Sequence, residues 1–130
     1  MRVYRSMKEA QDGLPAVGPS GRLLGVRPGN AATADVLAVN PSDIVPPGTG
    51  GMSVAPGDPL FLQRHRRPIA LGGIGRDPVW YIETDDLGDE LVFRQDRPEH
   101  GLVEPKCPLT LDEFQQALAK SRSHWQLYCR

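Results

Sequence analysis

The densest group of side chains able to do chemistry is the segment QRHRRP, in which Arg64–Arg67 bring together three arginines and a histidine. Such positive charge can contact phosphate, nucleic acid or an acidic protein, although a solvated loop is the commoner outcome. The stretch LGGIG, residues 71–75, lacks the strand-to-helix setting of a dinucleotide fingerprint, so we predict no phosphate site there. Cys107 and Cys129 lie outside any metal-type cluster, so we expect no metal and two reduced thiols, with a disulfide as the alternative.

The length and composition suit one folded domain spanning residues 1–130. Hydrophobic residues make up 39% and charged residues 24% of the chain, as in ordinary soluble domains. The formal net charge is only -1, so no overall field attracts nucleic acid or an anionic membrane, and any basic site must be local. We therefore expect no membrane partner and consider nucleic acid an unlikely one.

Turn-forming residues, 14 Gly and 13 Pro, are spread along the whole chain. This distribution favours short strands joined by many turns, whereas residues 29–47 are predicted to be mainly loop. Apolar runs bounded by turn residues predict strands at Val3–Tyr4, Leu23–Val26, Asp35–Val39, Met52–Val54, Val79–Ile82, Leu91–Phe93 and Leu102–Val103.

One clear helix is predicted to begin at Thr110, because Thr110 and Glu113 form a TLDE capping box. An apolar stripe at helical spacing follows, and we expect the helix to reach about Arg122. A single helical turn is also predicted from Asp58, its cap, to Leu62.

The N-terminal sequence MRVYRSMKEAQDG has no apolar core of the kind found in signal peptides, and no run is long enough to span a bilayer. We therefore expect a cytoplasmic protein unless a dedicated secretion system exports it.

Four stretches of the chain, in this order, resemble one family of small bacterial toxins: VYRS, GTGGMSV, HGLVEPKCPL and TLDEFQQALAKSRSHW. The chain is similar to the Tse-type effectors of type VI secretion, whose fold is of the ADP-ribosyltransferase type. The resemblance implies an α+β fold: a compact split antiparallel β-sheet core around an NAD-binding cleft, with a C-terminal α-helix. It also implies NAD as the cofactor and a cognate immunity or antitoxin protein as partner.

The same resemblance implies residues that bind the dinucleotide. Arg5, at the end of the first strand, matches an arginine that binds the pyrophosphate, and Arg27 is a second candidate. Ser53 resembles a strand hydroxyl that shapes the nicotinamide pocket, while Gly51 lets a ligand approach the backbone closely. Tyr4 is a candidate for stacking on nicotinamide, although an aromatic residue in a first strand usually belongs to the core.

Three residues are candidates for catalysis: Glu104, Ser53 and His100. Glu104 is the best-placed glutamate to bind the ribose 2′-hydroxyl and steady an oxocarbenium-like transition state. The chain lacks the paired Gln-x-Glu or Glu-x-Glu of the transferase pattern, however, which favours a solvated strand-end role for Glu104. His100 matches the family histidine, whose neutral imidazole hydrogen-bonds ribose or substrate.

Three functions remain open at this point. The first is an NAD-dependent ADP-ribosyltransferase toxin acting on a cellular target. The second is a non-catalytic toxin or binding module with the same fold that acts through a protein partner. The third is a nucleic-acid-modifying enzyme of the phosphotransferase type that uses His65, His100 and the arginine loop.

Overall fold

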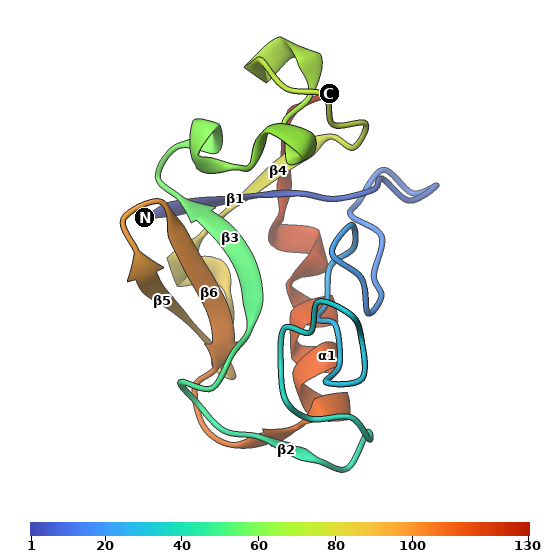
Figure 1. Ribbon diagram of the computed structural model, residues 1–130, viewed down its shortest axis with the longest axis vertical. Helices are drawn as coiled ribbons and strands as arrows, with labels where there is room; N and C mark the ends of the chain where they lie inside the picture. Colours follow the sequence, from blue (N-terminus) through green and yellow to red (C-terminus); the bar gives the residue numbers. More distant parts are fainter.

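A six-stranded antiparallel sheet organises the chain in a computed structural model that describes residues 1–130 (Figure 1). The strand order is β5-β6-β3-β1-β4-β8, and a separate two-stranded ribbon pairs β2 with β7. The strands are β1 Arg2–Ser6, β2 Ile44–Val45, β3 Met52–Pro56, β4 Val79–Glu83, β5 Leu91–Arg97, β6 His100–Pro105, β7 Leu109–Thr110 and β8 Gln126–Cys129.

The sheet is split into two halves that share only β3. One end of β3 pairs with β1, through Tyr4 opposite Ala55 and Val3 opposite Pro56. The other end, Met52–Val54, pairs with β6. In Figure 1 β1 runs across the view, whereas β3, β5 and β6 run downward below it on the left, so the two halves diverge. The α+β class and the split antiparallel sheet predicted from the sequence are confirmed.

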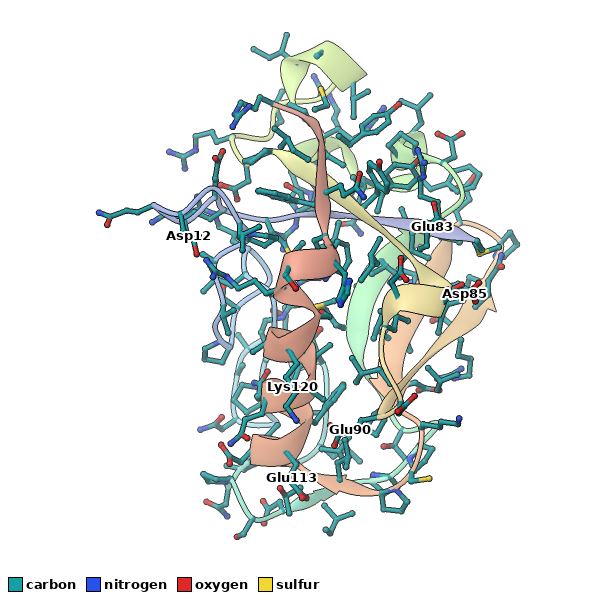
Figure 2. All side chains as sticks on the ribbon, turned by 180° about the vertical axis from the view of Figure 1, so that it is seen from behind. Asp12, Glu83, Asp85, Glu90, Glu113 and Lys120 are labelled. Carbon is teal, nitrogen blue, oxygen red and sulfur yellow. The ribbon has the colours of Figure 1, made fainter.

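The core lies between the sheet and the helix α1 (Leu111–Lys120), and it holds 19 buried residues. Trp80 of β4 and Phe114 of α1 are among its largest fully buried side chains. Trp80 donates its indole N–H to the carbonyl of Met7 at 2.8 Å, so its polar atom is satisfied inside the core. Figure 2 shows Lys120 of α1 and Glu90, just before β5, whose side chains are 3.4 Å apart and link helix to sheet.

The predicted helix is confirmed at its start. Thr110 is the N-cap, with its hydroxyl accepting from the Glu113 amide and the Glu113 carboxylate accepting from the Thr110 amide. The α-helix ends at Lys120, short of Arg122, and a 3-10 turn, η5 (Ser121–His124), continues it before β8. None of the helices in the structure combines the length and the apolar character that crossing a membrane requires.

Five of the predicted strands are present, and two are not. Leu23–Val26 forms only an isolated bridge, between Leu24 and Val17, and Asp35–Val39 is not a strand. Leu24, Val26 and Val36 are buried all the same, because loops rather than strands carry these side chains into the core. An apolar run indicates that its residues are buried. It forms a strand only where a neighbouring strand can pair with it. The edge strand β8 was not predicted.

Short 3-10 turns occupy the segment between β3 and β4. The first, η1, has Asp58 as its N-cap, whose carboxylate accepts from the amide of Leu60, so the predicted turn is confirmed. The segment continues over the sequence QRHRRP, and Gly72 with φ 75° ends its last turn in the left-handed region. These turns are η1 Pro59–Phe61, η2 Arg64–Arg66 and η3 Ile69–Leu71, and η4 Thr84–Asp86 follows β4.

The capping box offers a test of what holds α1 in place. We expect Thr110→Ala to destabilise the fold by about 1 kcal/mol, because it leaves the Glu113 amide without its acceptor. Thermal unfolding should show a drop of about 3–5 °C in Tm. Thr110→Ser keeps the hydroxyl and should unfold like the wild type; an equal loss in both variants would mean that the methyl group, rather than the cap, matters.

Candidate functional site

Arg5 sits where the two halves of the sheet part. Its backbone still pairs with Trp80 of β4, but the pairing of β1 with β3 has already ended at Tyr4. The guanidinium bridges the resulting opening: Nη1 donates to the Ser53 carbonyl of β3 at 2.8 Å, and Nη2 donates to the Leu23 carbonyl at 2.8 Å. Only 6% of Arg5 is exposed. One side chain therefore ties β1, β3 and the loop around Leu23 together.

The charge of Arg5 has no carboxylate beside it. All of its hydrogen bonds go to neutral backbone carbonyls, and Asp35 acts only at a distance because its carboxylate is bound to Arg27. Burial lowers the pKa of Arg5 to about 10, so the group remains charged at neutral pH. A buried cation without a counterion is costly, and an anion bound beside it would offset that cost.

A cavity of about 170 Å³ opens beside Arg5, at the bend of β3. It continues past Phe61 and Gln63 into a shallower depression, of about 420 Å³, that reaches Arg97 and Pro98 at the β5–β6 turn. The polar side chains that line the cavity include those of Arg5, Arg27, Ser53, Arg66, Glu99 and His100.

Two further arginines add to the positive charge of the cavity. Arg27 is ion-paired with Asp35 at 3.0 Å. Arg66 donates to the carbonyl of Gly21 at 2.6 Å, and burial followed by the nearby charge of Arg27 lowers its pKa. Of the three guanidinium groups, only that of Arg27 is paired with a carboxylate, that of Asp35. Such an excess of positive charge is suited to binding phosphate groups.

The β5–β6 turn brings acidic and imidazole groups to the same cavity. Glu99 is exposed and is the only carboxylate among the residues that line the cavity. His100 is half-buried, and its Nδ1 lies 2.7 Å from Oδ1 of Asp96. The lining of the cavity therefore combines a carboxylate and an oriented imidazole with Arg5 and Ser53.

Four of the residues expected from the sequence meet at this cavity, namely Arg5, Arg27, Ser53 and His100. Tyr4 does not line it, because alternation along β1 turns Tyr4 to the other face of the sheet. There its ring packs edge-on against Tyr128, with centroids 5.2 Å apart, and against Tyr81 at 6.1 Å.

Glu104 and Gly51 also lie outside the cavity. Glu104 is neither solvated, as a strand-end residue would be, nor open to a ligand: it is 3% exposed and its carboxylate binds Arg94 of β5 at 2.8 Å. A Cβ at Gly51 would lie 2.3 Å from the carbonyl oxygen of Val103. The glycine is thus needed for the close approach of β3 to β6 rather than for access to a ligand.

Sequence reasoning missed Glu99, Gln63 and Arg66 as individual site residues. Arg66 belongs to the basic segment that stood out in the sequence, but nothing marked which of its arginines turns inward. Glu99 precedes His100 directly, so its signal was present beside a chosen residue. No group of three or more His, Cys, Asp or Glu side chains is placed to hold a metal ion, and both cysteines are free.

The split antiparallel sheet with an arginine-lined cavity at the split is consistent with a domain of the ADP-ribosyltransferase type. The model of the family described as Tse2 ADP-ribosyltransferase toxin matches residues 5–125. The chain therefore belongs to this family of bacterial toxins. Searches among curated proteins and among solved structures gave no significant match.

An ion pair fixes the loop that receives the Arg5 guanidinium. Arg22, in that loop, binds the carboxylate of Asp77 through two contacts, at 2.7 and 2.8 Å, and Asp77 is 13% exposed. The hydrogen bond from Arg22 holds the pKa of Asp77 below its ordinary value of 3.8. This pair contributes stability above that value and loses it as the pH falls through the lower folded-state pKa.

We expect Asp77→Asn to flatten the acid side of the stability profile. Urea unfolding at about pH 5 and about pH 3 should show a smaller loss of stability for this variant than for the wild type, because the variant has no carboxyl to protonate. Asp89→Asn, at an exposed turn position without an ion pair, serves as the matched control. Parallel profiles for Asp77→Asn and the wild type would contradict a depressed pKa at Asp77.

Proposed function

We propose that the protein is an enzyme that binds NAD in the cavity at the split of the sheet and transfers ADP-ribose to a cellular target. The observation that carries this proposal is the Arg5 guanidinium, which is buried, charged and held only by carbonyls at the wall of the cavity. A pyrophosphate beside Arg5 would supply the missing negative charge. Membership of the ADP-ribosyltransferase toxin family supports NAD as its source.

The other residues of the cavity fit the remaining parts of the dinucleotide. Arg27 and Arg66 extend the phosphate-binding wall, and Ser53, on β3, shapes the nicotinamide end. Breaking the bond between nicotinamide and ribose passes through an oxocarbenium-like transition state, which a carboxylate stabilises. We propose Glu99 for that contact, because Glu99 lines the cavity whereas Glu104 is occupied by Arg94.

Tyr4, Gly51 and Glu104 support the site from outside in this proposal. Glu104 holds β5 to β6 through Arg94, within the hairpin whose turn carries Glu99 and His100. Gly51 allows β3 to approach β6, and Tyr4 anchors β1 on the face opposite Arg5.

The biological setting follows the family. We propose that the protein is delivered by a type VI secretion system, acts in the cytoplasm of a bacterial cell, and is neutralised by a cognate immunity or antitoxin protein. Membership of a toxin family supports these statements. An inhibitor that covered the arginine-lined cavity would be sufficient for neutralisation.

The anion-binding role of Arg5 can be tested by a substitution that keeps its charge. We expect Arg5→Lys to lower kcat/KM for NAD turnover by about a hundredfold, since lysine cannot bind two phosphate oxygens and two carbonyls at once. The wild type should also gain thermal stability from added pyrophosphate, and the variant should gain much less. Release of nicotinamide and transfer of labelled ADP-ribose in bacterial lysate measure the activity.

Arg2→Lys is the matched control, because Arg2 lies on the same strand but is exposed and stacks on Tyr81. Ser53→Ala and Arg27→Lys should show smaller losses than Arg5→Lys. A wild type that neither binds pyrophosphate nor turns over NAD would overturn the proposal.

The choice between the two glutamates gives a second test. We expect Glu99→Gln to lower kcat by about tenfold to a hundredfold with little change in thermal stability, because Glu99 is exposed and has no ion pair. Glu104→Gln should mainly destabilise the fold, since it removes the ion pair between the buried Glu104 carboxylate and the exposed Arg94. If the reverse pattern appeared in turnover and unfolding measurements, Glu104 would be the catalytic carboxylate.

A second candidate is a non-catalytic toxin that acts by occupying a protein partner. The observation in its favour is that a single exposed carboxylate, rather than a pair, lines the cavity. Growth arrest that persists in Arg5→Lys and Glu99→Gln, without NAD turnover, would identify this function. The nucleic-acid-modifying reading is less favoured, because His65 lines a different depression from the one that His100 lines.

A further inference from the structure

We propose that Asp96 is a positioning residue that orients His100 as the general base toward the molecule that accepts ADP-ribose. This inference rests on the proposed function for the reaction itself. The orientation of the ring, however, rests on geometry alone. Sequence reasoning singled out His100 but gave no role to Asp96.

The observation behind this proposal is an irregularity in the ladder between β5 and β6. Gln95 lies opposite Gly101, and Arg97 lies opposite His100, so Asp96 has no partner of its own. Asp96 is therefore the extra residue of a β-bulge. Bulges re-aim a side chain and are frequent beside active sites. Here the bulge accompanies the 2.7 Å contact between the Asp96 carboxylate and Nδ1 of His100.

This contact decides which ring nitrogen carries the hydrogen. An ionised carboxylate only accepts hydrogen bonds, so Nδ1 of His100 must be the donor. In the neutral ring Nε2 then holds the lone pair, at the edge of the imidazole that is turned away from Asp96. Because His100 lines the cavity, Nε2 is the nitrogen available to a ligand there.

The charges around the pair keep Asp96 in its ionised form. Burial disfavours the carboxylate, but the hydrogen bond and the charge of His100, with Arg97 at 3.9 Å, outweigh burial and leave the pKa of Asp96 below its ordinary value. Arg94, on the same strand, also acts on Asp96 through its charge. His100 shares the lining of the cavity with the charged groups of Glu99, Arg5, Arg27 and Arg66.

The pair has a defined task in the transfer step. The nucleophile of the acceptor forms a bond to C1′ of the ribose while the bond from C1′ to the nicotinamide nitrogen breaks. The electron pair of the broken bond goes to that nitrogen and cancels its positive charge. Nε2 of His100 takes the proton of the nucleophile, and Asp96 stabilises the imidazolium that results. The pair therefore implies an acceptor whose attacking atom bears a proton.

The tautomer can be measured without any substrate. Nitrogen-15 NMR of the neutral ring in the wild type should show a protonated Nδ1 and a bare Nε2 in His100. Asp96→Asn should lose this preference, because an amide can donate as well as accept. Asp89→Asn, the same change at an exposed turn, should keep it. A protonated Nε2 in the wild type, or an unchanged tautomer in Asp96→Asn, would overturn the proposal.

Kinetics test whether the orientation is used. We expect Asp96→Asn to lower kcat for transfer to the acceptor by about tenfold or more with KM for NAD within about threefold. His100→Ala and the double variant Asp96→Asn/His100→Ala should be equally slow, since Asp96 acts only through His100. Additive losses would show that Asp96 acts elsewhere. A wild type without NAD turnover would refute the proposed function and the transfer step, whereas the NMR result would still decide the ring orientation.

Discussion

The arrangement of this protein depends on one buried charge. Arg5 gives up nearly all contact with water, and five hydrogen-bond contacts to the carbonyls of Leu23, Ser53, Ser20 and Gly25 replace that hydration. The hydrogen bonds tie a strand to a strand and both to a loop without neutralising the guanidinium. The same group therefore joins the two halves of the sheet and leaves a positive charge without a counterion at the opening between them. An anionic ligand would compensate that charge.

The split itself comes from the way β3 is shared. Two residue pairs join β3 to β1, and three further residues join it to β6, so no ladder continues across the whole sheet. Pairing of β1 with β3 beyond Tyr4 would have joined these two strands directly and closed the opening that the Arg5 guanidinium bridges. Because β3 turns away from β1, strand hydrogen bonds between them are lost beyond Tyr4. The Arg5 guanidinium supplies one hydrogen bond in their place, to the Ser53 carbonyl. The separation of β3 from β1 thus accounts both for the structural role of Arg5 and for the cavity beside it.

The residues that line the cavity differ in how strongly the fold restrains them. Arg5, Ser53 and Arg27 belong to strands or to loops fixed by ion pairs, whereas Glu99 and His100 sit at the end of the β5–β6 hairpin. The bulge at Asp96 and the ion pair of the buried Glu104 with the exposed Arg94 restrain that hairpin.

The sequence by itself determined the local features. The capping box fixed the start of α1, Asp58 fixed its short turn, and apolar runs marked β1, β3, β4, β5 and β6, because caps and periodicity depend on neighbours in the chain. The order of four motifs identified the family and three residues of the cavity, Arg5, Ser53 and His100, whereas Arg27 was a second candidate outside those motifs. Only the tertiary structure decided that Glu99 rather than Glu104 faces the cavity, that Tyr4 does not, and that Leu24 is buried without a strand. These outcomes depend on how β3 bends between β1 and β6 and on which face each strand presents, and both are set by contacts between residues far apart in the sequence.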